Sequence, residues 1–328
     1  MRMIKRLLAM LLVLLVLVAV GFAYYAMRPL PLPAQPLIFS LQQGSSLKAL
    51  ARQMRQAGIL QNEWVFVWLA RGLDKTTQIK AGNYELKSSV TPLQLLDIVS
   101  RGQVAFEQMS IIEGWTFNQY RAALNAAPNI RHDTAAWSEA EILQHIGARE
   151  EHAEGLFFPD TYYFASGTSD LDLLLRSYQA MQQRLQENWR TRVPGLPLYS
   201  PYQSLVLASI VEKETGRASD RNMVAAVFIN RLRIGMMLQT DPAVIYGMGA
   251  KFDGNLRRRD LLLDTPYNTY TREGLPPTPI ALPGYASLQA VLHPAQTDAM
   301  YFVARGDGSS EFSGSLEQHN RAVERYQK

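Results

Sequence analysis

The segment Leu205-Val-Leu-Ala-Ser-Ile-Val-Glu-Lys-Glu-Thr215 is predicted to form the central helix of this chain. Its first seven residues are apolar or small and show no polar face, which is typical of a helix buried on most sides. The preceding Ser200-Pro-Tyr-Gln203 predicts the start of this helix, with Ser as the N-cap, Pro in the first turn and Gln completing a capping box. Gly216 predicts its end. Glu212 would then lie near the C-terminal end of a core helix.

The predicted position of Glu212 has chemical consequences. Burial and the negative end of the helix dipole both favour a protonated carboxylic acid, and such a group can donate a proton to a leaving oxygen. The alternative is that Glu212 is simply the first solvated residue at the helix end. Glu214 follows two residues later and points about 200° around the helix from Glu212, so the two are not expected to form a facing pair.

The composition bounds the possible functions of the chain. Its 328 residues are enough for two domains, and with 47% hydrophobic and 19% charged residues it is a globular protein. The net charge of +4 is spread along the chain, so no basic block predicts nucleic-acid binding. The chain has no cysteine, which excludes thiol catalysis, disulfides and cysteine-ligated metals.

The N-terminal residues predict a membrane anchor. Residues 1–6 contain three cations, and residues 7–27 then contain no charge, which is just long enough to cross a bilayer. The charge bias predicts a cytoplasmic N-terminus and a single pass through the inner membrane. The alternative is a signal peptide cleaved near Gly21-Phe-Ala23. Four prolines follow within residues 28–36, which predicts a stiff, extended spacer leading away from the membrane.

Residues 37–104 predict a small module of their own. A strand at 37–41 precedes helices beginning near Ser45 and Asn62, and a second strand, 80–86, precedes a third helix opened by a capping box at Thr91. This strand–helix–helix–strand order resembles a LysM-type peptidoglycan-binding module. The alternative is a small structural α+β layer without a ligand.

Residues 105–328 predict a larger mixed domain, so we expect an α+β fold overall. Capping boxes at Thr116, Ser138 and Ser315 each predict a helix, and residues 170–189 form a long amphipathic pattern. A hairpin is predicted between residues 300–304 and 311–313. The aromatic segment 154–164 predicts core packing or, alternatively, a wall on which sugars stack. Residues 265–284 have little periodicity, and long ordered loops of this kind are often functional.

A set of polar residues lies near Glu212 in the sequence and could share a site with it. Asp241 precedes a proline and could equally be a helix N-cap, while Asn230 could satisfy a buried backbone group. Turn chemistry alone could explain the residues 268–270. The full set is Asn230, Gln239, Thr240, Asp241, Asn268, Thr269 and Tyr270. The five histidines are scattered, so we expect neither a metal nor a cofactor.

Six motifs in order resemble those of the endolytic murein transglycosylase family (the MltG or YceG-like proteins). The match spans nearly the whole chain, including the anchor and the LysM-like module. In the loop 274–284, Thr278 and Leu282 depart from the smaller or more polar residues that are common in the family. The motifs are Leu207-Ala-Ser-Ile-Val-Glu-Lys-Glu214, Val227-Phe-Ile-Asn-Arg-Leu232, Leu238-Gln-Thr-Asp-Pro242 leading into Val244-Ile-Tyr-Gly247, Tyr267-Asn-Thr-Tyr270, Gly274-Leu-Pro-Pro277 and His319-Asn320.

The resemblance implies an enzyme that cuts peptidoglycan glycan strands internally, between N-acetylmuramic acid and N-acetylglucosamine, in the periplasm. Glu212 would correspond to the catalytic acid, serving as acid and then as base while the C6 hydroxyl of the sugar closes a 1,6-anhydro ring. The residues implied to bind substrate or hold the site in shape are Asn230, Gln239, Thr240, Asp241, Asn268 and Tyr270. Enzymes of cell-wall synthesis are possible partners.

Three alternatives remain open at this point. A hydrolase would need a second carboxylate, for which Asp241 is the candidate. A non-enzymatic wall-binding or assembly protein would bind glycan without cutting it. A cytoplasmic lyase acting on a small metabolite would fit poorly with the anchor and the spacer.

Overall fold

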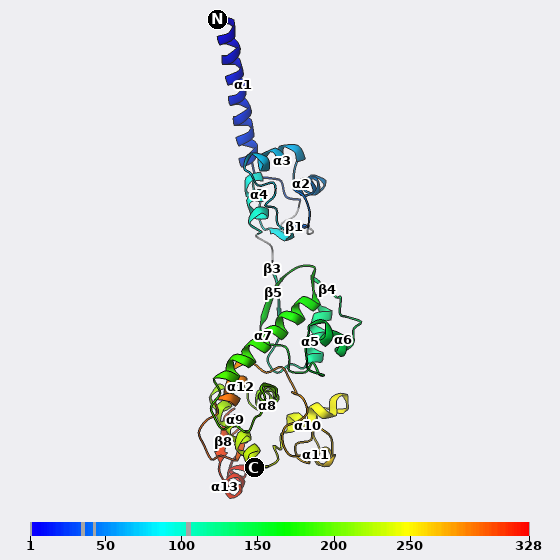
Figure 1. Ribbon diagram of the computed structural model, residues 1–328, viewed down its shortest axis with the longest axis vertical. Coiled ribbons are helices and arrows are strands. Elements are labelled where there is room, and N and C mark those ends of the chain that lie inside the picture. Colours follow the sequence, from blue (N-terminus) through cyan, green and yellow to red (C-terminus); the bar gives the residue numbers. More distant parts are fainter. Residues whose placement is uncertain (1, 34–36, 42–43, 103–105, 328) are drawn as a thin grey trace. The chain divides into compact units, whose positions relative to one another are not determined.

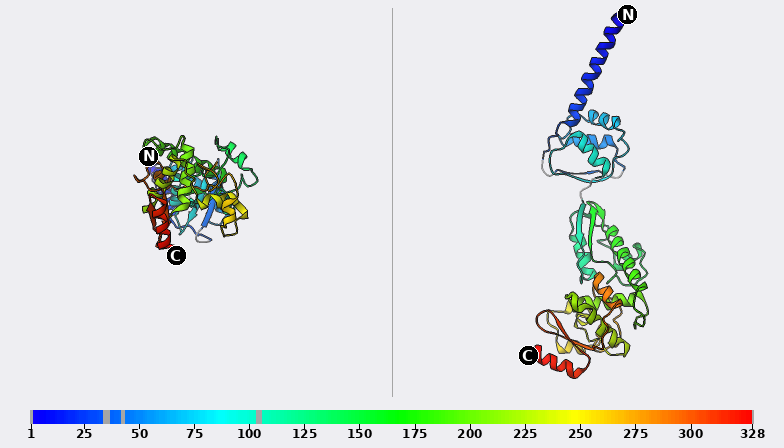
Figure 2. Two further views of the ribbon diagram at one scale, coloured as in Figure 1. Left: turned by 90° about the horizontal axis from the view of Figure 1, so that it is seen from below. Right: turned by 90° about the vertical axis from the view of Figure 1, so that its left-hand side faces the viewer.

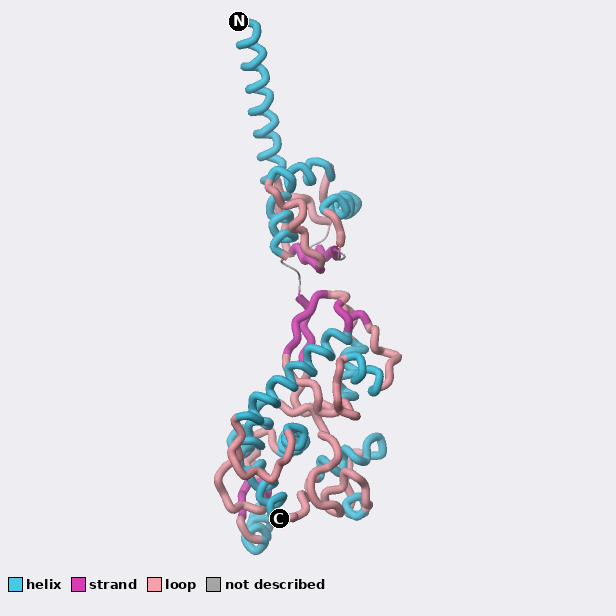
Figure 3. Tube along the Cα trace, in the orientation of Figure 1, coloured by secondary structure: helices cyan, strands magenta, loops and turns pink. Residues whose placement is uncertain are grey.

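We describe the fold from a computed structural model of the chain, which describes residues 2–33, 37–41, 44–102 and 106–327 (Figure 1). The chain divides into two compact units: residues 1–108 with 163–167, and residues 109–162 with 168–328. The mixture of helices and short strands confirms the predicted α+β class (Figure 3). The predicted boundary between residues 104 and 105 falls on residues outside the described ranges.

The first unit contains a β-α-α-β-α module. Strands β1 (Leu37–Leu41) and β2 (Gly82–Leu86) pair antiparallel, with Leu37 opposite Leu86. The helices between and after them are α2 (Leu47–Gln56), α3 (Glu63–Gly72) and α4 (Pro92–Arg101). Each helix begins at a side-chain cap, and the predicted capping box between Thr91 and Gln94 is present. Leu50, Met54, Phe66, Tyr84 and Leu95 form a core in which none is measurably exposed.

The first helix of the chain, α1 (Arg2–Met27), runs into this module. Its segment Ile4–Met27 is long and apolar enough to cross a membrane. Ala26 and Leu30 are buried in the core of the module, and the Leu30 N–H donates to the Val90 carbonyl at 2.9 Å. The prediction that residues 28–36 all lead away from the anchor is therefore wrong for Leu30, which packs on the module; residues 34–36 are not described.

The second unit is built around α8 (Pro201–Glu214), which confirms the predicted core helix. Every residue from Leu205 to Val211 is at most 2% exposed. Helices α7 (Asp170–Arg190), α9 (Ala218–Arg233), α10 (Asp241–Met248) and α12 (Tyr285–Leu292) all contact it.

Two predicted details of α8 are wrong. The Ser200 side chain caps the helix as expected, but the Gln203 amide accepts from the Tyr199 N–H, so the capping box is incomplete. The helix ends at Glu214, and its C-cap is Thr215, which has an extended backbone, rather than Gly216. Helix α9 begins after Arg217, its N-cap residue, which makes no side-chain capping hydrogen bond.

Short strand pairs and helices complete the second unit. Strand β7 (Tyr301–Ala304) pairs antiparallel with β8 (Ser310–Ser313), which confirms the predicted hairpin, and α13 (Leu316–Tyr326) packs against both (Figure 2). Strand β3 (Phe106–Ser110) pairs with β5 (Thr161–Ala165), and both strands have residues in each unit. The remaining elements of the second unit are β4 (Ile130–Arg131), which pairs with β6 (Thr168–Ser169), and the helices α5 (Phe117–Ala126), α6 (Glu139–His145), η1 (Gly249–Lys251) and α11 (Arg258–Leu262).

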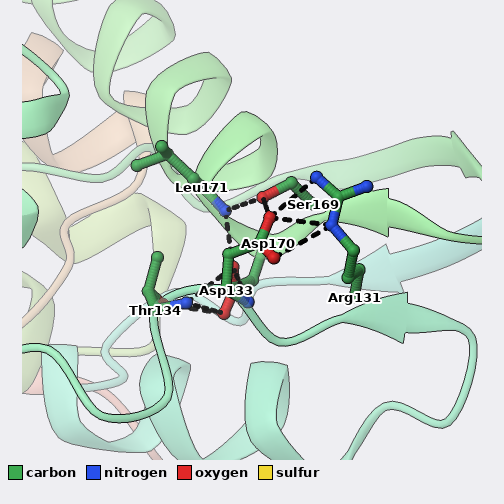
Figure 4. Close-up of polar contacts among 6 residues, drawn as sticks. All are labelled: Arg131, Asp133, Thr134, Ser169, Asp170 and Leu171. Carbon is green, nitrogen blue, oxygen red and sulfur yellow. Dashed lines mark hydrogen bonds and ion pairs between the residues drawn. The ribbon is translucent and has the colours of Figure 1, made fainter.

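A buried carboxylate fixes the start of α7 (Figure 4). Asp170 is fully buried and accepts hydrogen bonds from the backbone N–H groups of Asp133, Thr134 and Leu171, and from the Thr134 hydroxyl at 2.7 Å. Asp133 in turn pairs with Arg131. All these groups satisfy one another, so this acidic cluster joins β4 to α7 and is structural.

Candidate active site

A polar cleft of about 590 Å³ opens beside the C-terminal end of α8. It lies entirely in the second unit and is formed by α8, α9, the residues leading into α10, the hairpin β7–β8 and α13. Charged, aromatic and amide side chains converge in it. The polar and aromatic residues that line it are Glu214, Arg231, Gln239, Asp241, Tyr270, Tyr301, Phe302, His319 and Gln327.

Glu214 is the half-buried acid of this cleft. Its carboxylate accepts a hydrogen bond of 2.6 Å from the Thr240 hydroxyl. Burial is the largest influence on this group and raises the pKa of Glu214; the negative charge of Asp241 raises it further. The Thr240 hydrogen bond and the Arg231 charge act in the opposite direction. A carboxyl group with a raised pKa is suited to act as a general acid.

Asp241 and Tyr270 form a pair at the mouth of the cleft. The Tyr270 hydroxyl donates to the Asp241 carboxylate at 2.5 Å. Burial, followed by this hydrogen bond and the Asp241 charge, raises the pKa of Tyr270, so the phenol stays neutral. Asp241 is the first residue of α10, whose N-cap is Thr240, so the alternative of Asp241 as the N-cap is wrong.

Cationic and aromatic groups line the cleft opposite these acids. The buried Arg231 guanidinium donates to the carbonyls of Leu238 at 2.7 Å and Met300 at 2.8 Å, and it stacks on the Tyr301 ring. The His319 ring stacks on the same Tyr301 ring, with the ring centroids 5.1 Å apart. Burial and the Arg231 charge lower the pKa of His319, so its imidazole is neutral near pH 7.

The segment 238–240 is held by the loop 265–284, as the position of Thr269 shows. The Gln239 N–H donates to the Thr269 carbonyl at 3.0 Å, and the Thr240 N–H donates to the Thr269 hydroxyl at 2.9 Å. Gln239 has φ +52°, a left-handed conformation that is uncommon outside glycine. Such backbone strain is typical of functional sites because the surrounding structure must maintain it.

The predicted site residues therefore divide into two groups. Gln239, Asp241 and Tyr270 line the cleft, and Thr240 bonds its acid. Asn230 instead donates to the carbonyls of Thr297 and Ala299, as its alternative interpretation predicted.

The side chain of Asn268 likewise bonds backbone groups. It is fully buried, donates to the carbonyls of Leu261 and Leu263, and accepts from the Tyr270 N–H at 2.9 Å. Both amides shape the site without lining the cleft.

Glu212 lies in a different cluster. One of its oxygens accepts from the Gly284 N–H at 2.9 Å and from the Ser287 hydroxyl at 2.8 Å, and the other lies 3.9 Å from the Arg221 guanidinium. Glu113 is close by, since a Cβ at Gly284 would overlap its carboxylate, and burial and the Glu212 charge raise the pKa of Glu113. Among the described residues, no hydrogen bond or ion pair joins Glu212 to residues 239–241 or 270, and its catalytic role stays a prediction.

Sequence reasoning missed six of the nine polar and aromatic residues of the cleft: Glu214, Arg231, Tyr301, Phe302, His319 and Gln327. One signal was present, because an acid two residues from Glu212 must face another side of the helix. The other signal was Arg231, a long charged side chain that follows the apolar run 224–229 of α9. Nothing in the periodicity indicated that the hairpin β7–β8 and α13 would line a cleft together with the end of α8. In the described part of the chain, no group of three or more His, Asp or Glu could hold a metal ion.

Comparison with known proteins identifies similar chains. Residues 39–325 match the YceG-like family. The chain is 28% identical to an endolytic murein transglycosylase of Bacillus subtilis (strain 168), over 88% of this chain and 84% of the relative. It is 26% identical to an endolytic murein transglycosylase of Streptococcus pneumoniae serotype 2, over 92% of this chain and 61% of that longer relative. Among solved structures, a yceG-like protein of Listeria monocytogenes matches with a TM-score of 0.55 and 28% identity, over 88% of this chain and 98% of that one.

Proposed function

This chain belongs to the YceG-like family, and from that premise we propose that it is an endolytic murein transglycosylase, the activity named for its relatives. The substrate is the glycan strand of peptidoglycan, cut within its length to leave 1,6-anhydro-N-acetylmuramic acid ends. The observation that carries the proposal is the cleft, in which a half-buried acid with a raised pKa, Glu214, lies among polar and aromatic side chains.

We assign the acid of the reaction to Glu214 in place of Glu212. Glu214 donates its proton to the glycosidic oxygen, and the bond from that oxygen to C1 of the muramyl sugar breaks. Positive charge develops at C1. The resulting carboxylate takes the proton of the C6 hydroxyl, and the C6 oxygen bonds to C1 and closes the anhydro ring. Glu214 thus returns to its protonated form, and no second carboxylate is needed.

The neighbours of Glu214 fit this cycle. The Thr240 hydroxyl holds the Glu214 carboxyl group in one orientation, so less conformational entropy is lost when the reactive geometry forms. The Arg231 charge favours the carboxylate that exists between the two proton transfers. Gln239 and the Asp241–Tyr270 pair are placed to orient the sugar by hydrogen bonds. The stacked Tyr301 and His319 rings form an aromatic part of the cleft wall.

Glu212 stays the alternative acid, and its contacts argue for a structural role. Its carboxylate accepts two hydrogen bonds, and its other oxygen lies 3.9 Å from the Arg221 guanidinium, so both oxygens have partners within the protein. It also ties α8 to the start of α12 through Ser287. We propose that Glu212 holds the end of the loop 265–284 in place.

A hydrolase is the second candidate function, and one observation favours it. Asp241 is close enough to Glu214 for its charge to raise the pKa of that acid, so two carboxyl groups share the cleft. In a hydrolase, Asp241 would act as the nucleophile or activate a water. Its engagement by the Tyr270 hydroxyl favours an orienting role instead.

We further propose that α1 anchors the protein in the inner membrane in a single pass, with the N-terminus cytoplasmic and the cleft in the periplasm. The apolar segment Ile4–Met27 and the cations before it support this proposal. The β-α-α-β order of the first unit supports a LysM-like module that binds glycan. Enzymes of cell-wall synthesis are the partners that this location would bring close.

The test is the product formed by the full chain in detergent from purified glycan strands, identified by mass spectrometry. We expect anhydro-terminated fragments from the wild type and from Glu212→Gln, and none from Glu214→Gln. Reducing-end fragments would establish a hydrolase. Binding of strands without cleavage would contradict both enzymatic functions.

A further inference from the structure

Helix α3 of the first unit presents two tryptophans to solvent. Trp64 is 53% exposed and Trp68 is 59% exposed. They are four residues apart and therefore lie on the same face of the helix, one turn from each other. The other face of α3, which includes Phe66 and Leu69, is buried in the module core. Two large exposed indoles side by side are unusual in a monomeric protein and indicate an interaction surface.

Both indoles are accompanied by cations. Lys48 Nζ of α2 lies 4.9 Å from the centre of the Trp64 ring, and Arg71 Cζ lies 5.3 Å from the centre of the Trp68 ring. We call the four residues Lys48, Trp64, Trp68 and Arg71 the tryptophan face. The acid of α3, Glu63, is neutralised by Arg55 at 3.4 Å. The face is therefore both aromatic and positively charged.

The chain just before α3 lies beside the end of the apolar helix α1. A pocket of about 490 Å³ is lined by Tyr24 and Tyr25 of α1, by Arg28, which follows α1, and by Gln61, two residues before α3. Figures 1 and 2 show α3 at the end of the module where α1 enters it. Arg28 is the first charge after the apolar segment, so in a membrane it would mark the level of the lipid headgroups.

We propose that the tryptophan face lies in the headgroup region of the membrane that α1 spans, and that anionic phospholipid is its partner. The proposal rests on the anchoring function proposed for α1. Indole rings favour the membrane interface because one edge is polar and the rest is apolar, and cations beside them attract anionic headgroups. The module would then be attached to the bilayer at two points, the helix α1 and the face of α3.

A glycan strand is the rival partner, because aromatic rings also stack on sugars. The cations argue against it. Lys48 and Arg71 each lie over a face of one indole, which is the part of the ring that a sugar would cover. At a membrane interface the same cations reach the phosphates while the ring edges contact the acyl chains, so both groups are used.

The experiment measures tryptophan fluorescence of the full chain reconstituted in vesicles of phosphatidylethanolamine and phosphatidylglycerol, with and without brominated acyl chains. Bromine quenches only indoles that reach the bilayer. The chain has five tryptophans, so the double variant Trp64→Phe/Trp68→Phe is compared with Trp189→Phe, which removes an indole that also has a cation over it but lies in the other unit. Trp64 and Trp68 are exposed, and their replacement should leave the fold, followed by circular dichroism, unchanged.

We expect bromolipid quenching in the wild type and in Trp189→Phe, and its nearly complete loss in the double variant. Replacing phosphatidylglycerol by phosphatidylcholine should weaken the quenching, and Lys48→Gln/Arg71→Gln should remove that lipid dependence. Unchanged quenching in the double variant would overturn the proposal. A change in Trp64 and Trp68 emission on adding glycan strands in detergent, without quenching in vesicles, would also overturn it and assign the face to sugar.

Carbonate extraction of the same vesicles separates this proposal from the anchor. If α1 spans the bilayer, the protein stays with the vesicles at alkaline pH. If the protein is retained on the vesicles and the double variant is quenched as strongly as the wild type, the membrane contact proposed for the tryptophan face is contradicted while the anchor stands. Release of the protein contradicts the anchor and, with it, the present proposal, whereas the reaction assigned to the cleft is measured independently in detergent.

Discussion

The Thr240 hydroxyl donates a hydrogen bond of 2.6 Å to the Glu214 carboxylate, and thereby joins the residue before α10 to the last residue of α8. Two segments 26 residues apart in sequence meet at this contact. It places the acid of the cleft beside Asp241, the next residue along the chain. The relationship explains why Glu214 lines the same cleft as Gln239, Asp241 and Tyr270.

The first prediction separates the two glutamates of α8. Glu214→Gln should lower the rate of strand cleavage by about 10²–10⁴-fold, since this is the usual contribution of a positioned general acid. Glu212→Gln should retain the rate within about tenfold, because it only weakens contacts that hold the nearby loop.

The measurement is the initial rate of anhydro-end formation by the full chain in detergent, with protein folding checked by circular dichroism. The opposite pattern, an inactive Glu212→Gln beside an active Glu214→Gln, would return the acid to Glu212.

The second prediction concerns pH. Glu214 must be protonated to act as an acid, so activity should fall as the pH rises through its raised pKa. The charge of Asp241 is one cause of that raised pKa. Asp241→Asn removes the charge, lowers the pKa of Glu214 and should move the basic limb of the activity profile toward acid pH.

The profile of kcat/KM against pH tests this prediction, together with the identity of the product. Thr240→Val should move the basic limb the other way, because the Thr240 hydrogen bond lowers the pKa of Glu214. A basic limb that stays in place in both variants would show that another group is being titrated.

The third prediction concerns the stability of the second unit. Glu154 is only 6% exposed, accepts from the Phe117 N–H and the Tyr246 hydroxyl, and burial raises its pKa from 4.5 to about 7. The folded state therefore binds the proton more tightly than the unfolded state, and stability is lost as the pH rises from about 4.5 to about 7. The loss attributable to this group is about 3 kcal/mol, at ~1.4 kcal/mol per pKa unit.

Glu154→Gln should remove this dependence while keeping both hydrogen-bond partners. The unfolding free energy in urea should therefore fall between pH 4 and 8 by about 3 kcal/mol more in the wild type than in the variant. Glu317→Gln, at an exposed pair with Arg321, is the control and should behave like the wild type. Parallel curves for the wild type and Glu154→Gln would exclude Glu154 as the titrating group.

The fourth prediction tests the structural role of Asn268. Asn268→Ala leaves the carbonyls of Leu261 and Leu263 and the N–H of Tyr270 without this partner, which should cost about 1–3 kcal/mol of stability. Because the change releases Tyr270, KM for glycan strands should rise more than kcat falls. Urea unfolding measures the loss of stability, and steady-state kinetics measure kcat and KM. A fall in kcat at constant KM would indicate that Asn268 participates directly in the reaction.

Much of the local structure could be predicted from the sequence. The caps at Ser46, Thr91, Thr116, Ser138 and Ser315 are local signals, since each involves a side chain and a backbone group two or three residues away. The buried helix α8 was equally readable from its apolar run. These features depend on near neighbours and do not require knowledge of the tertiary fold.

The choice between Glu212 and Glu214 could not be made in this way. Helical periodicity separates the two side chains but does not say which side the later segments cover. That choice is made by long-range contacts, such as those of Thr240 with Glu214 and of Ser287 with Glu212. The packing of α10 and α12 against α8, and of β7 against α9, determines which side chains meet each glutamate.

The late position of α13 and the hairpin β7–β8 in the chain has a consequence for biosynthesis. They supply Tyr301 and His319 to the cleft, whereas Glu214 is synthesised about a hundred residues earlier. Because a ribosome makes the chain from its N-terminus at about 5–20 residues per second, a nascent protein contains the acid for several seconds before the opposite wall exists. The polypeptide would therefore become competent to cut the cell wall only after α13 has been synthesised.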